Sequence, residues 1–465
     1  MTTILQPRDA QQLRECFARL RKAGRALEQL PTASVLQLLE DCSQDWLPGS
    51  PLHEQAVQRL AGAFSEKATR SALCALSASM RTEALTAAME LELGRADLLD
   101  RWAPDATQSG WSRALPLGVV AQVLAGNVFL GGVIALAQSL LTRNAVLLKL
   151  SSDEAGFTEL LVRQLQQRDR DGRVGRAVAV CAWSSAEEDL NQVIRDQADA
   201  VVVWGGQAAI DAYPAARCRG KVIHHGPRIG IGVLLSGADL PAALAGLAWD
   251  VALWEQRACS SPRLLFVEGS VQRAYEVAAG LSAALQQVQS DLPARQLSLD
   301  DKAEIRTIRE MAYWHQHAQI YAAARSMDHT VLVVEELPST LPVGYRTVVI
   351  VPLPDLATLP ELLAPAASTS RLTAGLQTVV LAAPPERWPE AALTLCRAGF
   401  TQVAAAGSAA ARSLGLPHEG DYSLRRLIRL VGIDLGAGPL VARHRPAVEA
   451  IAASLASAVK SDRAG

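Results

Sequence analysis

A cysteine in a short polar loop is the residue of this sequence best suited to covalent chemistry. Cys259 lies in the stretch EQRACSSPRLLFVEG, after an apolar amphipathic segment and before an apolar run that is typical of a strand. A loop can present a thiolate to a cleft, and nearby positive charge or backbone N–H groups make the thiolate accessible by lowering its pKa. Arg257 and Arg263 flank it in the sequence. Cys259 is therefore a candidate nucleophile, and the alternative is a buried, inert cysteine.

Asn127 is a candidate for stabilising negative charge. It lies in LAGNVF, between an apolar run at 119–124 and a helical stretch that begins near 128. A side-chain amide at such a turn could donate a hydrogen bond to a developing oxyanion. The C-terminal ends of parallel strands are also where open α/β sheets build ligand sites. The alternative is an N-cap of the following helix, a common role for asparagine.

Lys149 could hold a nucleotide. In LLKLSS it ends an apolar strand and is followed by Ser151 and Ser152. An ammonium group at a strand end could bind a ribose hydroxyl or a phosphate as a point charge.

A pair of glycines follows another strand. In VVVWGGQAAI, Gly205 and Gly206 come after Trp204 and before a helical segment. Backbone at such a turn can approach a pyrophosphate, with the helix N-terminus aimed at it. A bare glycine pair is equally consistent with a simple tight turn.

Alternating strands and helices must position these residues. Strands are expected at 119–124, 145–150, 177–181, 200–204 and 229–235, with helices near 128–141, 154–168, 186–196 and 207–214. This alternation predicts right-handed βαβ units and a parallel sheet covered on both faces. A second block follows, with helices near 239–256 and 270–287 and strands at 263–268, 330–334, 347–351 and 378–381.

The composition is that of a globular protein. A chain of 465 residues has a prior of two or three domains at about 150 residues each, and 49% hydrophobic residues exclude a disordered chain. The net charge of −2 gives no reason to expect nucleic acid or an anionic membrane as partner. Seven cysteines without a CxxC pair argue against a disulfide framework and against a structural zinc site, so no metal is expected. No signal peptide is visible, which makes the cytoplasm the default location.

One uncharged segment has the length of a membrane helix. It runs from Arg113 to Arg143. Pro116, the turn at 125–127 and Gly131 interrupt it, so we predict a buried strand and a buried helix and no membrane span.

The four motifs occur in a familiar order. The series strand–AGN, strand–KxSS, strand–WGG and helix–Cys–strand resembles the aldehyde dehydrogenase superfamily. Within it, LAGNVF, VVWGGQAAI and ACSSPR look most like the long-chain acyl-CoA reductases of the bacterial (luminescence) fatty acid reductase family, and the later HEGDYSLRRLIRLVGID is similar too. The resemblance covers roughly residues 110 to 435. It implies that the Cys259 thiolate is acylated while Asn127 and the Cys259 N–H hold the oxyanion.

A departure from the superfamily concerns the general base. Oxidising aldehyde dehydrogenases have a glutamate in an ELGGK-like stretch before the cysteine, whereas the matching stretch here, HHGPR at 224–228, has no carboxylate. Without that base an acyl-cysteine should hydrolyse slowly, while thiol transfer and hydride transfer remain open. This favours a thioester reductase. His224 could still act as a base, or the stretch could be structural.

A second departure concerns the cofactor. Many NAD-preferring relatives have a glutamate three residues after the lysine, where Ser152 stands here, and its absence makes NADPH acceptable. Glu335 and Glu336 resemble the acidic pair that precedes FGP in the superfamily, which implies that Glu336 binds the nicotinamide ribose. FGP itself is absent, so a solvated pair is the alternative.

The sequence thus predicts an α/β, aldehyde-dehydrogenase-like fold. The expected domains are a helical N-terminal region at 1–105, an NAD(P)-binding Rossmann-like domain at 106–238 that includes part of that region, a catalytic domain with the cysteine at 239–425, and a C-terminal segment at 426–465 that could form an oligomer contact.

The expected reaction is NADPH-dependent reduction of an acyl-CoA or acyl-protein thioester to an aldehyde. An acyl-protein synthetase partner and a homo-oligomer are implied by the resemblance. The alternatives are an NAD(P)-dependent aldehyde dehydrogenase that uses His224 as base, and a non-catalytic scaffold subunit.

Overall fold

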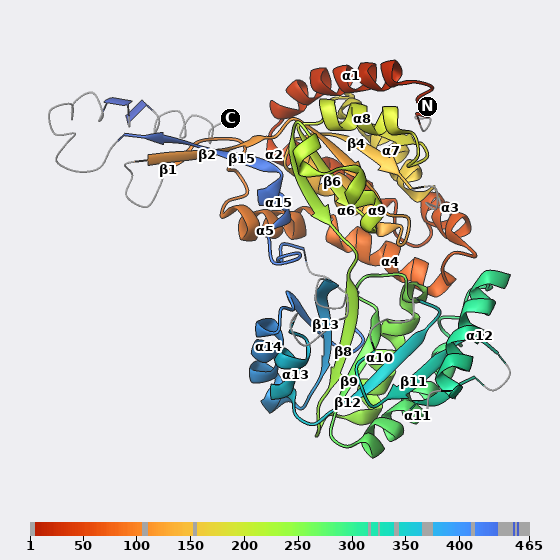
Figure 1. The fold of residues 1–465 in the computed structure, drawn as a ribbon. Helices are drawn as coiled ribbons and strands as arrows, with labels where there is room; N and C mark the ends of the chain where they lie inside the picture. The colour runs from red at the N-terminus through yellow and green to blue at the C-terminus, as the bar shows by residue number, and fades with distance from the viewer. Residues whose placement is uncertain are drawn as a thin grey trace.

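A computed structural model describes residues 5–104, 110–151, 156–314, 318–323, 326–338, 344–364, 375–410, 414–435, 450–451 and 453–454. Two units, each with its own sheet, lie one below the other (Figure 1). A three-stranded sheet extends sideways from the upper unit.

Five amphipathic helices open the upper unit, in agreement with the expectation of a helical N-terminal region. They are α1 (Ala10–Glu28), α2 (Thr32–Gln44), α3 (Pro51–Leu60), α4 (Glu66–Ser79) and α5 (Thr82–Leu93). In α1 the apolar residues recur at three and four and are buried, namely Leu13, Cys16, Phe17 and Leu20. The Asp9 carboxylate caps this helix by accepting from the Gln12 N–H.

The upper unit is built on a five-stranded parallel sheet in the order β5-β4-β3-β6-β7. Its strands are β3 (Val119–Val123), β4 (Ala145–Leu150), β5 (Val178–Ala182), β6 (Ala200–Trp204) and β7 (Lys221–His225). Strands β3 and β4 are buried along their whole length, which explains why their residues are apolar except for Gln122 and Lys149. The first four confirm the expected strands, whereas β7, with its polar end, was not predicted.

Helices cover both faces of this sheet. They are α6 (Leu130–Leu141), α7 (Phe157–Arg168), α8 (Glu188–Gln197) and α9 (Gln207–Ala212). Helices α6 and α7 pack with α2 on one face, and α8 packs with α1 on the other. The uncharged segment from Arg113 to Arg143 therefore contains strand β3 and helix α6. Within the described ranges, no helix combines the length and the apolar character needed to cross a membrane.

The lower unit is built on a seven-stranded sheet in the order β10-β11-β12-β9-β8-β13-β14. Its strands are β8 (Ile229–Leu234), β9 (Pro262–Glu268), β10 (Ala318–Ala322), β11 (Thr330–Val334), β12 (Thr347–Leu353), β13 (Leu376–Ala382) and β14 (Gln402–Ala405). Only β10 is antiparallel to its neighbour. The helices are α10 (Leu240–Ala252), α11 (Val271–Val288), α12 (Leu299–Trp314), α13 (Leu359–Leu362) and α14 (Trp388–Arg397).

The position of β8 corrects the expected domain boundary at residue 238. Strand β8 pairs with β9 and β13 of the lower sheet, although the sequence placed it in the first block. The chain therefore passes between the sheets at residues 226–228, directly after β7. The apolar sequence of a strand does not indicate which sheet the strand belongs to. The apolar pattern alone therefore could not distinguish β8 from the strands of the upper sheet.

The sheet at the side of the molecule joins distant parts of the chain. It contains β1 (Ala103–Pro104), β2 (Gly110–Pro116) and β15 (Ile428–Asp434), which pair in antiparallel fashion and in the order β1-β2-β15. The short helix α15 (Ser423–Arg426) leads into β15. Much of β15 is exposed, including Leu430.

An aromatic cluster locks the two units together next to the cysteine loop. Trp254 follows α10 of the lower unit, yet its ring lies 5.6 Å from that of Phe129 and 5.4 Å from that of Phe64, both in the upper unit. Phe129 in turn contacts Phe157 at 4.8 Å. Burial of such rings contributes strongly to stability, so this cluster fixes where the loop after Trp254 lies.

Candidate active site

The turn before Cys259 has an unusual backbone conformation. Trp254, Glu255 and Gln256 have φ values of 59°, 54° and 57°, which lie in the left-handed region. Non-glycine residues adopt this region at a cost, and surrounding contacts must hold them there. The chain is thereby turned from the end of α10 into the loop 257–261, which carries the cysteine and leads into β9.

The Gln256 side chain supplies such contacts. It is fully buried, and its Nε2 donates to the carbonyl oxygens of Pro262 at 2.7 Å and Thr347 at 2.8 Å. Its Oε1 accepts from the Thr347 N–H at 2.9 Å. Because Gln256 precedes the cysteine loop and Pro262 follows it, this one amide closes the loop and ties it to the start of β12.

Cys259 is exposed in this loop, which excludes the alternative of a buried, inert cysteine. Arg263 is a cationic side chain whose charge interacts with it. Burial lowers the pKa of Arg263, and the negative charge of the Cys259 thiolate opposes that shift. The attraction is mutual, so a positive charge lies where it favours the thiolate.

Asn127 reaches across from the upper unit to the cysteine loop. Its Nδ2 donates to the carbonyl oxygen of Arg257 at 3.0 Å, two residues before Cys259. The N-cap position of α6 is held by Phe129, and no side chain caps that helix. The N-cap alternative for Asn127 is therefore wrong. The structure places Asn127 beside the loop that carries Cys259, and its role at the oxyanion stays a prediction.

A cavity of about 800 Å³ opens at the carboxyl ends of strands β3 to β6. Three predicted residues line it, namely Lys149, Ser151 and Trp204. The Lys149 Nζ lies 3.4 Å from the Trp183 carbonyl oxygen and 5.2 Å from the centre of the Trp183 ring. Burial lowers the pKa of Lys149. Ser152 lies outside the described residues.

The glycine pair lies beside this cavity rather than in its wall. Gly206 is the N-cap residue of α9, at an ordinary φ of −72°, and the Gly205 N–H donates to the carbonyl oxygen of His225. Among the described residues that line the cavity, residues 204–213 contribute Trp204, Ala209, Ala212 and Tyr213. The tight-turn interpretation accounts for what the structure shows of Gly205 and Gly206.

Glu336 is at the wrong end of the lower sheet, which corrects its expected role. The amino ends of the parallel strands β9, β12 and β11 are in register, and the cysteine loop adjoins that edge. Glu336 follows the carboxyl end of β11, and this strand alone separates its two ends by about 13 Å at 3.3 Å per residue. It is exposed there, so it does not belong to the site around Cys259.

His224 contacts the backbone of the upper unit. Its Nε2 lies 2.9 Å from the Tyr213 carbonyl oxygen, and a carbonyl can only accept a hydrogen bond. This nitrogen therefore carries a proton and is not available as a base, which removes one way in which His224 could replace the missing glutamate.

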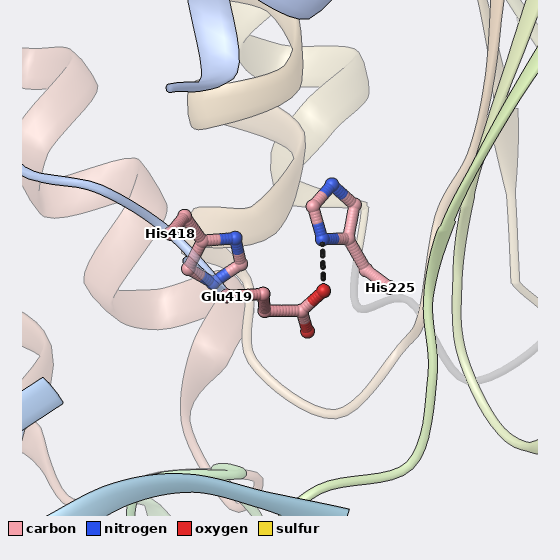
Figure 2. A group of neighbouring side chains, drawn as sticks. All are labelled: His225, His418 and Glu419. Atoms are coloured by element: carbon pink, nitrogen blue, oxygen red, sulfur yellow. Dashed lines mark hydrogen bonds and ion pairs between the residues drawn. The ribbon is translucent and has the colours of Figure 1, made fainter. Parts of the chain in front are cut away.

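His225 belongs to a polar cluster that contacts both units (Figure 2). Its ring stacks on Trp204 at 3.8 Å, and its Nδ1 lies 3.0 Å from Glu419 Oε2. Arg228 Nε donates to Glu419 Oε1 at 3.0 Å. Burial raises the pKa of Glu419, but hydrogen bonds and charge from His225 and Arg228 outweigh this and hold it at about 2.

The other member of the cluster is His418, which lies 3.0 Å from the Gln377 amide nitrogen on β13. The nearest ligand atoms of His225, His418 and Glu419 are within 4.8 Å of one another, a separation that could suit a metal ion. Arg228 already supplies positive charge to Glu419, however, and this favours an ion-pair network. The cluster therefore links the end of β7 to the lower sheet.

Sequence reasoning missed several residues that shape the site. Gln256 stands three residues before Cys259, where a polar side chain after an apolar helix was the available signal. Trp183 and Tyr213 line the cavity. Trp183 lies two residues after the strand predicted at 177–181, and Tyr213 lies near the end of the helix predicted at 207–214. Glu419 lies in the HEGDY stretch, whose resemblance to the family indicated no role for this residue.

The fold is shared with solved aldehyde dehydrogenases. An NAD-dependent benzaldehyde dehydrogenase from Corynebacterium glutamicum matches with a TM-score of 0.68 and 14% identity, over 92% of this chain and 91% of that one. A glyceraldehyde-3-phosphate dehydrogenase from Methanocaldococcus jannaschii, complexed with NADP, matches with a TM-score of 0.70 and 12% identity, over 93% and 95%. The protein thus has the aldehyde-dehydrogenase-like α/β fold that the sequence predicted.

The family is narrower than the fold. The family model described as "Acyl-CoA reductase (LuxC)" matches residues 27–430, and the chain belongs to this family. A long-chain acyl-protein thioester reductase from Vibrio harveyi is 31% identical over 217 residues, 46% of this chain and 45% of that protein. One from Photorhabdus luminescens is 31% identical over 214 residues, 46% and 44%. The aligned region thus spans about half the length of these curated relatives.

Proposed function

We propose that this protein reduces an acyl thioester to an aldehyde through an acyl-cysteine formed on Cys259. The observation that carries the proposal is the hydrogen bond from Asn127 to the backbone of the Cys259 loop. This hydrogen bond connects the loop of an exposed cysteine in the lower unit to the segment that follows β3 in the upper unit. The upper unit contains the cavity. Membership of the LuxC family and the names of the curated relatives support the same reaction class.

The chain's own residues account for the acyl-transfer step. The Cys259 thiolate, favoured by Arg263, attacks the thioester carbonyl, and the carrier thiolate leaves as the new carbon–sulfur bond is completed. The second N–H of the Asn127 amide and the Cys259 backbone N–H stabilise the oxyanion. After reduction of the acyl carbon, the carbon–sulfur bond breaks, which releases the aldehyde and restores the thiolate.

A nicotinamide cofactor fits the cavity of the upper unit. The cavity volume is in the range of ligand sites, and the buried Lys149 ammonium can bind a ribose hydroxyl or a phosphate. When bound, NADPH supplies the hydride and leaves as NADP⁺. We infer NADPH rather than NADH from Ser152, which replaces the glutamate that would repel a 2′-phosphate.

The acceptor of the acyl group in the free enzyme can be tested directly. The full chain, incubated with radiolabelled acyl-CoA without cofactor, is expected to retain label. Cys259→Ala should retain none, while Cys396→Ala, which removes another exposed cysteine, should label like the wild type. Added NADPH should then release labelled aldehyde from the wild type. Persistent labelling of Cys259→Ala would overturn the assignment.

The same assay distinguishes the acyl carriers. Acyl-CoA and an acyl-protein thioester are both offered, because the curated relatives are named for acyl-protein thioesters. If neither labels the wild type, the proposed reaction is wrong and a scaffold role, with a synthetase as partner, is favoured. Free acid as the product with NAD(P)⁺ and aldehyde would favour the oxidative alternative.

We further propose that the protein forms a homo-oligomer through the side sheet. Strand β15 ends the order β1-β2-β15 of the described strands and exposes Leu430, a combination that favours pairing between copies. Light scattering after size exclusion should show a smaller particle for Leu430→Arg than for the wild type. Equal masses would contradict this contact.

A further inference from the structure

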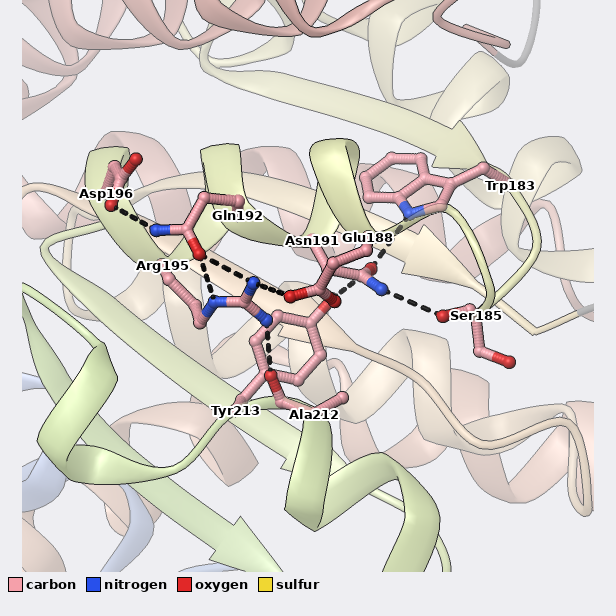
Figure 3. Close-up of polar contacts among 9 residues, drawn as sticks. All are labelled: Trp183, Ser185, Glu188, Asn191, Gln192, Arg195, Asp196, Ala212 and Tyr213. Atoms are coloured by element: carbon pink, nitrogen blue, oxygen red, sulfur yellow. Dashed lines mark hydrogen bonds and ion pairs between the residues drawn. The ribbon is translucent and has the colours of Figure 1, made fainter.

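One buried side chain holds two aromatic walls of the cavity in the upper unit. Asn191 lies on α8 and is only 1% exposed. Its Oδ1 accepts from the Trp183 Nε1–H at 3.1 Å and from the Tyr213 hydroxyl at 2.9 Å, as Figure 3 shows. Its Nδ2 donates to the Ser185 carbonyl oxygen at 2.9 Å. Trp183, Ser185 and Tyr213 all line the cavity.

Helix formation does not explain an asparagine at this position. Asparagine is a weak helix former, and it lies in the first turns of α8 with its side chain turned inward. Both ends of its amide bond to groups outside the helix. Its Oδ1 accepts from the loop after β5 and from the end of α9, and its Nδ2 donates to the loop after β5. A buried amide satisfied in this way fixes its partners, because any other arrangement leaves polar atoms unpaired.

The two anchored rings come from different segments of the chain and donate to the same oxygen atom. Trp183 follows β5 and has the Lys149 ammonium 5.2 Å from its ring centre. Tyr213 follows α9, and burial raises its pKa, so its hydroxyl stays protonated and donates to Asn191. One turn further along α8, buried Arg195 donates to the Ala212 carbonyl oxygen at 2.7 Å (Figure 3). Helix α8 thus sets the relative positions of the loop after β5 and the end of α9.

We propose that Asn191 is a positioning residue for the cofactor, which determines cofactor affinity by fixing Trp183 and Tyr213 and has no part in acylation of Cys259. This rests on the proposed function. Without Asn191, two rings must be immobilised when the cofactor binds, and ordering each such side chain weakens binding. Acylation of Cys259 needs no cofactor, so its rate is a reference against which a loss of cofactor affinity can be compared.

The test compares cofactor affinity with acylation in the full chain. Energy transfer from protein tryptophans to bound NADPH gives Kd, since Trp183 and Trp204 both line the cavity. Asn191→Leu is expected to raise Kd for NADPH about tenfold or more, with the rate of labelling by acyl-CoA unchanged. Gln192→Ala is the matched control, because Gln192 bonds only Arg195 and Asp196 within this network (Figure 3) and is expected to keep both values.

Tyr213→Phe removes one of the two contacts and keeps the ring. Tyr213→Phe is expected to fold and to raise Kd for NADPH about threefold. It therefore tests the proposal if Asn191→Leu does not fold. In the double variant the Tyr213 contact is already lost, and Kd should rise no further than in Asn191→Leu alone. Independent, multiplying effects would indicate general destabilisation and overturn the coupling.

The outcomes separate the inference from the function on which it rests. If the wild type binds neither NADPH nor NADH, the cofactor part of the proposed function fails. If the wild type binds and both variants keep its Kd, the positioning role of Asn191 fails alone. Equal losses of affinity and acylation would assign Asn191 a purely structural role.

Discussion

At the scale of single residues, Asn127 connects the two halves of the site through one amide. Because one of its N–H groups is bonded to the Arg257 carbonyl, only the other remains for an oxyanion. Asn127→Ala is expected to lower turnover by about a hundredfold, the effect of losing one oxyanion donor. Thermal unfolding should change little, since Asn127 caps no helix. The rate of NADPH oxidation in the steady state measures turnover. Unchanged turnover would mean that Asn127 only holds the cysteine loop and does not stabilise the oxyanion.

Lys149 is expected to control cofactor binding and not acylation. Lys149→Met should raise Kd for NADPH about tenfold or more, the loss of a charge-assisted hydrogen bond. Burial lowers the pKa of Lys149, so its charge and the cofactor affinity should be lost on raising the pH sooner than for an exposed lysine. Titration of Kd between neutral and alkaline pH checks this. The same pH dependence in Lys149→Met would assign it to another group.

The residues that sequence reasoning found are those whose signal is local. Asn127 and Lys149 lie near the carboxyl ends of β3 and β4, and Cys259 lies just before β9, so each became a candidate through its position beside an apolar run. Their roles stay predictions. Gln256 and Glu419 were missed because their partners are remote. Thr347 lies 91 residues from Gln256, and His225 lies 194 residues from Glu419. Glu336 was misassigned because an acidic pair does not reveal at which end of the sheet it lies.

At the scale of elements, the left-handed turn at 254–256 and the amide of Gln256 together fix the cysteine loop. Gln256→Ala leaves the Thr347 N–H and two carbonyl oxygens without this partner, so we expect it to lower the free energy of unfolding by about 3 kcal/mol. A displacement of the loop by about 1 Å would also slow acylation about a hundredfold. Denaturant unfolding and the labelling rate measure the two effects.

A matched control separates stability from positioning. Gln164 is another buried glutamine, whose Nε2 bonds the Cys42 carbonyl oxygen and the Asp45 carboxylate in the upper unit. Gln164→Ala should lower stability without slowing the acylation of folded protein. If Gln256→Ala behaves in the same way, the turn supports the fold alone.

The elements themselves were largely predictable, and their partners were not. Largely apolar runs predicted β3, β4, β6, β9 and β12, because strands that are covered on both faces need that composition. The same runs do not specify which sheet a strand joins, so β8 was assigned to the wrong unit. Strand β7 ends in two histidines. His225 is buried against Trp204 and contacts Glu419, whereas His224 contacts the Tyr213 carbonyl oxygen.

At the scale of the whole molecule, the loop at 418–421 joins the units on the side of the chain crossing. Glu419 bonds His225 at the end of the upper sheet and Arg228 in the connection to the lower one, while His418 contacts Gln377 on the lower sheet. The carboxylate is nearly buried, with 8% of its side chain exposed. Such a pair loses stability when one partner is removed, because the other charges keep their desolvation cost.

Acid should weaken this junction in a definite pH window. The folded pKa of Glu419, about 2, lies below its value in the unfolded chain, so its contribution to stability is complete above about pH 4.5. It falls as the pH drops through the window from 4.5 to 2, because the unfolded chain takes up the proton first. The shift corresponds to about 3 kcal/mol at most. Glu419→Gln should therefore be less stable than the wild type at neutral pH, and the difference should vanish near pH 2.

Glu268 is the control that separates an effect on the junction between the units from a general effect of a buried carboxylate. Its pKa is also held at about 2, by Arg387, but all its partners lie in the lower unit. Glu268→Gln should lose stability in the same pH window while Kd for NADPH stays unchanged in the folded protein. Glu419→Gln should also weaken NADPH binding, because His225 stacks on Trp204 in the cavity wall and loses its anchor. Equal behaviour of the two variants would mean that the loop at 418–421 supports the fold without reaching the cofactor cavity.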